Sequence, residues 1–118
     1  MNFAEIKKIL SAKIIVEPTE SLDVLTGCGA DLMSDVLAFT KEKTVLLTGL
    51  TNPQVIRTAE MTDLVMVVFV RGKKPPEATI KLAKEKKVPL LVTDKPLYES
   101  CGLLYEAGLK AETLSKLE

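Results

Sequence analysis

Three clusters of polar residues, each following an apolar run, are the strongest candidates for binding chemistry. The first is Thr48-Gly49-Leu50-Thr51-Asn52, the second begins with Arg71-Gly72, and the third is Thr93-Asp94-Lys95. A glycine turn that leads into a helix presents backbone N–H groups to an anion, and an arginine can hold a phosphate through two hydrogen bonds. We therefore predict that a small anionic, nucleotide-like ligand binds at a site formed by Gly49, Thr51, Asn52, Arg71 and Gly72.

The same residues also have ordinary structural explanations. Asn52 followed by Pro53 is a common helix start, in which the asparagine caps the helix and the proline occupies its first turn. Arg71 is equally explained as a solvated surface side chain, or as one that is paired with Asp94 or Glu99. The sequence alone leaves both interpretations open.

Other reactive groups form no recognisable catalytic constellation. Asp31 and Asp35 are one helical turn apart, which suits a metal or acid–base pair, but capping is favoured because no third oxygen ligand stands at a fixed spacing. The chain has no histidine, which excludes His-dependent triads, and it has no Walker-type phosphate loop. We therefore expect no catalytic residue, no metal site and no cofactor, and no hydrolase or kinase activity.

The two cysteines stand alone in the sequence, without a second Cys at metal-ligand spacing. Cys28 is flanked by glycines, so we expect it to be the more exposed thiol, although a cysteine that serves as a small apolar residue is the commoner case. Cys101 shares a helical spacing with Tyr98, Leu104 and Tyr105 and is expected in the core. The apolar stripe of Tyr98, Leu104 and Tyr105 fits either internal packing or a dimer seam.

The elements that must position these residues are the three apolar runs, Thr44–Thr48, Leu64–Val70 and Leu90–Thr93. They show no alternation of polar and apolar residues, which is typical of strands buried on both sides in a parallel sheet. Each run leads through a turn and a proline into an amphipathic helical pattern. The pattern predicts an α/β fold, a mainly parallel β-sheet with packed helices, whose ligands gather at the carboxyl ends of the strands. The prolines are Pro53, Pro75 or Pro76, and Pro96.

The N-terminal part of the chain follows a different pattern. Asn2 is expected to cap a short helix, and a strand is expected over Lys13–Glu17. Leu22–Leu25 reads as a second extended run that a glycine-rich turn, Gly27–Gly29, closes. The next helical pattern begins at Asp31, which we expect to act as its cap or as an anion in its first turn.

Length and charge limit the classes of protein. The 118 residues fit one domain, 1–118, with a polar tail at 110–118 that we expect to be mobile or docked on a partner subunit. Sixteen basic and sixteen acidic side chains cancel, which argues against nucleic acid or an anionic membrane as partner and favours self-association. No apolar run reaches roughly 18 residues, and no signal segment is evident. We expect a cytoplasmic homodimer.

Four segments, taken in their order and spacing, resemble those of a known protein family. They are Gly29–Leu37, Leu47–Asn52, Val67–Pro75 and Val88–Thr93. With these segments, the stretch from about Gly27 to Leu109 resembles a DRTGG domain. Such domains lie between CBS domains in some pyrophosphatases and precede the catalytic domain in some phosphotransacetylases, and their fold is related to the N-terminal domain of HPr kinase. The name-giving turns appear here as Gly49-Leu50-Thr51 and Val70-Arg71-Gly72, so Gly49 and Gly72 are their only direct matches.

The resemblance implies an HPr kinase N-terminal domain-like fold and a non-enzymatic function. It implies a dimeric regulatory or protein-interaction module that senses a small anionic ligand and acts in trans on an unknown partner protein. Two alternatives from other classes stay open: a small enzyme or phosphotransfer accessory that uses the strand-end loops, and a purely structural dimer. Fold resemblance alone does not establish function.

Overall fold

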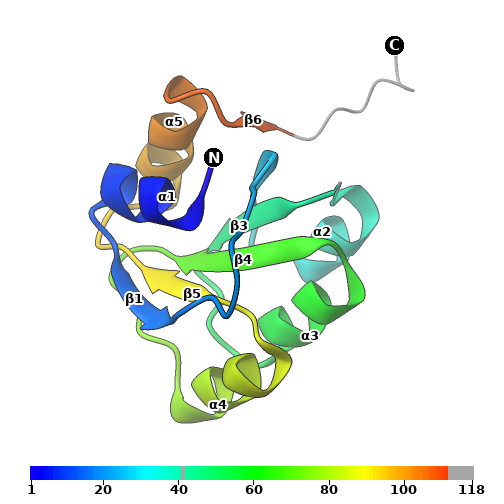
Figure 1. Cartoon of the computed structure of the whole chain (residues 1–118). Helices are drawn as coiled ribbons and strands as arrows, with labels where there is room; N and C mark the ends of the chain where they lie inside the picture. The colour runs from blue at the N-terminus through cyan, green and yellow to red at the C-terminus, as the bar shows by residue number, and fades with distance from the viewer. Residues whose placement is uncertain (41, 112–118) are drawn as a thin grey trace.

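The described part of the chain, residues 1–40 and 42–111 of a computed structural model, folds into a six-stranded sheet with helices on both faces (Figure 1). In chain order its elements are α1 (Phe3–Leu10), β1 (Lys13–Val16), β2 (Thr26–Gly29), α2 (Met33–Phe39), β3 (Thr44–Thr48), α3 (Gln54–Met61), β4 (Leu64–Phe69), α4 (Glu77–Lys86), β5 (Leu90–Val92), α5 (Leu97–Glu106) and β6 (Lys110–Ala111).

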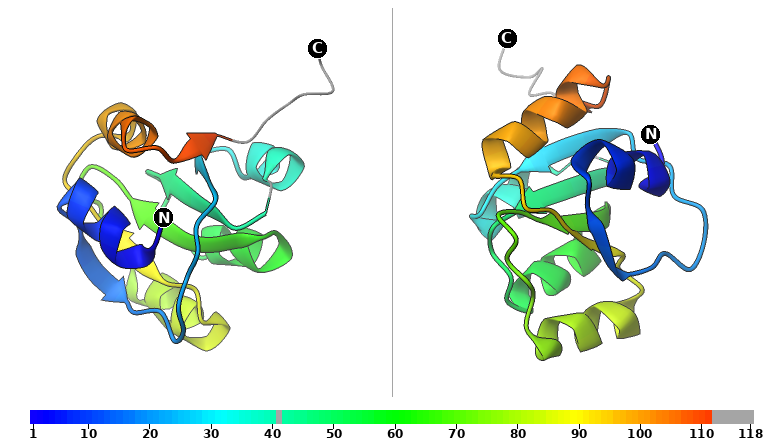
Figure 2. Two further views of the ribbon diagram at one scale, coloured as in Figure 1. Left: turned by 45° about the horizontal axis from the view of Figure 1, so that its top comes forward. Right: turned by 90° about the vertical axis from the view of Figure 1, so that its left-hand side faces the viewer.

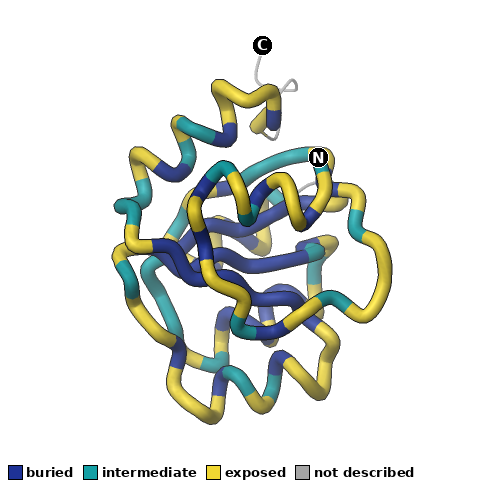
Figure 3. The backbone as a smooth tube through the Cα atoms, turned by 60° about the vertical axis from the view of Figure 1, so that its left-hand side comes forward, coloured by how far each residue is buried: buried dark blue, intermediate teal, exposed yellow. Residues whose placement is uncertain are grey.

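The sheet is mainly parallel, which confirms the α/β prediction. Its strand order is β1-β5-β4-β3-β2-β6, and only the pairing of β1 with β5 is antiparallel among the described strands. All residues of β3 and all but one of β4 are buried, as the continuous apolar runs predict. These two strands lie at the centre of the sheet (Figure 3).

Each face of the sheet has its own hydrophobic core. Leu46 and Leu47 are neighbours on β3 but belong to different cores, because successive side chains of a strand point to opposite faces. Helices α2, α3 and α4 cover the face of Leu46, and α1 and α5 cover the face of Leu47 (Figure 2). No helix in the described ranges is both long and apolar enough to cross a membrane.

The predicted helix starts are confirmed. Pro53, Pro76 and Pro96 immediately precede α3, α4 and α5. Asn2 caps α1 in a capping box: its side chain accepts the N–H of Glu5 at 2.8 Å, and the Glu5 carboxylate accepts the N–H of Asn2 at 3.1 Å.

The prediction for residues 22–31 is wrong in three respects. Leu22–Leu25 forms no strand, Gly27–Gly29 is part of strand β2 and not a turn, and Asp31 is not the cap of α2, which begins at Met33. The glycines of β2 serve close packing. A Cβ atom on Gly29 would lie 2.6 Å from Cys101 Sγ, and one on Gly27 would lie 3.2 Å from the Leu109 side chain.

The chain beyond α5 also differs from the predicted polar tail. Lys110 and Ala111 form β6, which pairs in parallel with Thr26 and Gly27 of β2. The remainder of the predicted tail, residues 112–118, lies outside the described residues, so its docking or mobility stays a prediction.

The close packing of α5 on β2 is open to a direct test. We expect Gly29→Ala to lower the free energy of unfolding by about 1–3 kcal/mol, because the added methyl group overlaps Cys101 Sγ. Removing the sulfur with Cys101→Ala should recover most of this loss in the double variant. Gly102→Ala is the control, since its Cβ would meet nothing within 4 Å and a helical alanine gains up to about 1 kcal/mol over glycine.

Chemical denaturation of the wild type, both single variants and the double variant measures the coupling energy. If Gly29→Ala costs as much in the Cys101→Ala background as in the wild type, the sulfur contact is not the reason for the glycine.

Candidate functional site

The carboxyl ends of β2, β3, β4 and β5 meet along one edge of the sheet, because these strands are parallel. We call this region the carboxyl edge and define it as residues 30–31, 48–52, 70–73 and 93–95. Hydrogen bonds join its segments: residue 31 bonds to residues 48 and 49, residue 71 to residue 95, and residue 72 to residue 93. The predicted site residues are therefore brought to one side of the molecule.

Asp31 holds the first of these segments together. One oxygen of its carboxylate accepts the Thr48 hydroxyl at 2.9 Å and the Gly49 N–H at 2.8 Å. The Thr48 hydroxyl oxygen in turn accepts the N–H of Leu50 at 3.1 Å. The Gly49 N–H, which we expected to bind a ligand, is thus donated to a carboxylate of the chain itself.

A positive charge also faces Gly49. A Cβ atom at this position would lie 3.8 Å from Lys73 Nζ and 3.7 Å from the nearer Asp31 oxygen. Both charged side chains therefore border the same glycine, and Lys73 offsets part of the negative potential of Asp31.

Thr51 and Asn52 make hydrogen bonds that fix the turn. The Asn52 side-chain oxygen accepts the N–H of Gln54 at 3.0 Å, so the ordinary helix-start interpretation describes this residue. The Thr51 carbonyl oxygen accepts the Thr79 hydroxyl at 2.8 Å, which ties the start of α4 to the turn. Within the described residues, the Thr51 hydroxyl and the Asn52 side-chain nitrogen form no hydrogen bond.

Arg71 and Gly72 form a left-handed pair with φ of 60° and 66°. The Arg71 N–H donates to the Lys95 carbonyl at 2.9 Å, and the Gly72 N–H donates to the Thr93 carbonyl at 2.8 Å, so the turn is anchored on the end of β5. Gly72 is required here, because a Cβ would lie 2.9 Å from an Asp94 oxygen as well as straining the backbone.

The Arg71 side chain is exposed, and no ion pair among residues 1–40 and 42–111 includes it. The alternative prediction, an ion pair of Arg71 with Asp94 or Glu99, is therefore wrong. Glu99 faces Lys95 instead, at 3.8 Å. The guanidinium keeps its five N–H donors for other partners.

The predicted order of exposure of the two cysteines is wrong, whereas the alternative in which Cys28 serves as a small apolar residue is confirmed. Cys28 is buried within β2, whereas Cys101 is only half-buried, and burial raises the pKa of the Cys101 thiol. The error comes from reading the glycines around Cys28 as a turn. In the described part of the chain, no group of three potential metal ligands is found, and the Asp31–Asp35 pair belongs to none.

The predicted apolar stripe on α5 is partly wrong. Leu104 is 2% exposed and belongs to the core, whereas Tyr98 is 92% and Tyr105 59% exposed. Only the two tyrosines remain available for an external contact.

Sequence reasoning missed the contributions of Asp31 and Lys73 to the carboxyl edge. Asp31 follows β2 by two residues, so recognising Gly27–Gly29 as a strand would have placed it at the same edge as Gly49. Lys73 directly follows the left-handed pair, and a lysine beside a second lysine, Lys74, carries no local signal of a site.

Comparison with known proteins agrees with this architecture. The model of the DRTGG domain family matches residues 5–107. This chain belongs to the DRTGG domain family. The resemblance seen in the sequence is thereby confirmed, and the match begins well before residue 27, where the quoted segments start. A comparison with curated protein sequences gives no match.

The DRTGG domain described here is similar in structure to part of a crystal structure of the CBS and DRTGG domains of the regulatory region of Clostridium perfringens pyrophosphatase, complexed with the activator diadenosine tetraphosphate. The TM-score is 0.73 at 16% sequence identity, and the match covers 86% of this chain and 45% of that one. Our chain thus spans less than half of its structural neighbour, and the likeness shows a shared fold.

We expect Asp31→Ala in this DRTGG domain to lower the free energy of unfolding by about 1–3 kcal/mol, because it removes a carboxylate that accepts two hydrogen bonds. Asp35→Ala, four residues away, is the matched control: no side-chain hydrogen bond or ion pair of Asp35 is found in the described residues, and we expect a change within about 0.5 kcal/mol. Urea denaturation measures both, and equal effects would contradict the structural role of Asp31.

Proposed function

We propose that this DRTGG domain is a non-enzymatic regulatory module of the cytoplasm that binds a small anionic ligand at the carboxyl edge and acts in trans on a partner protein. The observation that carries the proposal is the exposed Arg71 guanidinium, which stands without an ion pair in the described residues on a backbone anchored to β5. An anchored arginine is well suited to hold a phosphate or carboxylate.

The neighbouring groups define the proposed contacts more closely. Asp31 accepts the Gly49 N–H, so we assign the ligand to the groups that remain: Arg71, Lys73, the Thr51 hydroxyl and the Asn52 side-chain nitrogen. The Asp31 carboxylate repels an anion on its own side and so favours this position. Gly49 and Gly72 then shape the turns rather than bind the ligand.

Family membership favours a regulatory role over a small enzyme or a phosphotransfer accessory. The similar regulatory region of the pyrophosphatase was crystallised with a dinucleotide activator, which carries four phosphates between two adenosines. We therefore choose nucleotides with several phosphates as the first ligands to test.

Thermal-shift measurements with diadenosine tetraphosphate, ATP and inorganic phosphate test this proposal. We expect at least one polyphosphate to raise the melting temperature, and Arg71→Ala to weaken its binding about tenfold to a hundredfold, the equivalent of a charge-assisted hydrogen bond of roughly 1.5–3 kcal/mol. The fold should tolerate the change, since alanine and arginine share the Cβ that makes a left-handed backbone unfavourable.

Arg57→Ala is the matched control, because Arg57 is the only other arginine and lies on α3 outside the carboxyl edge. If Arg71→Ala and Arg57→Ala weaken binding equally, the ligand lies elsewhere. If none of the three anions stabilises the wild type, the proposed anion site is wrong.

We also propose that the domain is a homodimer that uses the outer face of α5. Tyr98 and Tyr105 are exposed there beside Gly102, whose missing side chain lets another helix approach. Tyrosine is enriched at interfaces, because its ring contributes apolar area and its hydroxyl tolerates water. A stable dimer is expected to bury on the order of 1,000 Å² or more in total.

Sedimentation equilibrium at micromolar concentration checks the dimer. We expect twice the chain mass of 12.9 kDa for the wild type, and a shift towards the monomer for Tyr98→Lys, because a buried lysine charge opposes association. Phe39→Lys is the control, since Phe39 is an exposed aromatic residue at the end of α2. A wild-type mass of one chain would contradict the proposal.

A further inference from the structure

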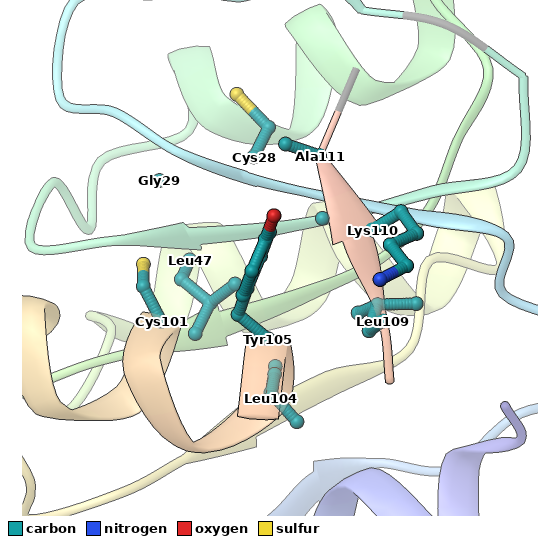
Figure 4. A pocket seen from close by; sticks show the side chains of 10 residues that line it. Cys28, Gly29, Leu47, Cys101, Leu104, Tyr105, Leu109, Lys110 and Ala111 are labelled. Carbon is teal, nitrogen blue, oxygen red and sulfur yellow. The ribbon is translucent and has the colours of Figure 1, made fainter. Parts of the chain in front are cut away.

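A pocket of about 190 Å³ lies between α5 and the β2–β6 edge of the sheet (Figure 4). Its lining residues come from β2, β3, α5 and the segment that forms β6, and none of them belongs to the carboxyl edge. The pocket is therefore separate from the anion site proposed above.

The interior of this pocket is apolar and has the size of one aromatic ring. Gly27 and Gly29 contribute no side chain, and Leu47, Leu104 and Leu109 are buried apolar residues of the lining. A cavity of about 150 Å³ with a similar apolar lining binds benzene. The pocket thus has room for a single six-membered ring with a substituent that reaches solvent.

Tyr105 and Lys110 border the open side of the pocket. Figure 4 shows Tyr105 extending from α5 towards the strands and Lys110 projecting from β6 beside it. Lys110 Nζ lies 5.4 Å from the centroid of the Tyr105 ring, a cation–π contact. Among residues 1–40 and 42–111, Lys110 is the only charged residue of the lining, and it forms no ion pair there.

The thiol of Cys101, which also lines the pocket, does not repel a negatively charged ligand. Cys101 is half-buried in the lining, and burial raises the pKa of its thiol, so the sulfur is uncharged at neutral pH. Within the described part of the lining, the Lys110 ammonium group therefore supplies the charge of the site.

We propose that this pocket binds a small aromatic carboxylate. The ring lies against Tyr105 and the side chains of Leu47, Leu104 and Leu109, and the carboxylate pairs with Lys110 at the open side. This site is independent of the anion site at Arg71, so either can fail without the other.

The proposal is tested by ¹⁹F NMR titration of the whole chain with 4-fluorobenzoate. We expect saturable binding with a millimolar dissociation constant, as befits a ligand of this size. Because Lys110 supplies the charge, 4-fluorobenzamide should bind several-fold more weakly, and 4-fluorobenzylamine more weakly still. Bound 4-fluorobenzoate should also slow the reaction of Cys101 with iodoacetamide, in a Cys28→Ala background that leaves one thiol.

Three variants separate the two contacts. Lys110→Gln should remove the preference for the carboxylate over the amide, and Lys110→Arg should retain it. Tyr105→Ala should weaken both probes. Phe39→Ala is the matched control, because Phe39 is an exposed aromatic residue at the end of α2 that neither lines the pocket nor belongs to the proposed dimer face, and it should leave binding unchanged.

Two results would overturn the proposal. One is the absence of any change in the ¹⁹F resonance at about ten times a millimolar dissociation constant. The other is binding that responds equally to Phe39→Ala and Tyr105→Ala and retains its charge preference in Lys110→Gln. An unchanged circular dichroism spectrum establishes that each variant is folded, and all the substituted residues except Cys28 are exposed.

Discussion

The burial of β3 and β4 from both sides is the constraint on which the rest of the molecule depends. An apolar strand with no wet face needs a strand on each edge and a helical layer above and below, and a parallel neighbour needs a crossover between the two. Each crossover of β2, β3, β4 and β5 therefore starts at the same edge of the sheet. The polar loop residues of the carboxyl edge therefore lie together because the central strands are parallel and buried on both faces.

Threonine hydroxyl groups then fix the loops at that edge. Thr48 joins Asp31, Thr79 joins the carbonyl of Thr51, and the buried Thr93 hydroxyl donates to the carbonyl of Leu10 at the end of α1 at 2.7 Å. Each such bond contributes about 1 kcal/mol, but an unsatisfied buried hydroxyl costs more, so these residues also select one loop conformation. A ligand site on these loops is preorganised by bonds that the ligand does not have to form.

The parts of the fold that follow from hydrophobic continuity could be read from the sequence, and those that depend on tertiary packing could not. The run Thr44–Thr48 and the helix start after Pro53 are local signals, and both are found in the structure. Gly27 and Gly29 carry the local signal of a turn, yet their place in β2 is set by Leu109 and Cys101, far away in the chain. Gly49 and Asp31 also lie far apart in the sequence, so their hydrogen bond could not be predicted. A helical spacing groups Leu104 with the two tyrosines but does not tell which of them faces the core.

Arg71 is the candidate site residue whose backbone is hardest to explain by packing alone. Ser11 and Lys87 also have positive φ, but they end α1 and α4, where a left-handed residue satisfies the last carbonyl groups of a helix. Lys43, with φ of 49°, precedes β3, and its N–H donates to the Asp63 carboxylate at 2.9 Å. Arg71 follows a strand and, with Gly72, forms the centre of a turn that the Lys73 N–H closes on the Val70 carbonyl at 3.2 Å, and such a turn with two left-handed central residues requires the positive φ. A side chain in this conformation costs about 1 kcal/mol or more relative to glycine. The second left-handed position of the turn is occupied by Gly72, and glycine adopts this conformation without strain. The backbone of this arginine is fixed by its N–H on the Lys95 carbonyl while its guanidinium reaches solvent, so a ligand at the proposed site would meet a side chain whose base is already held in place.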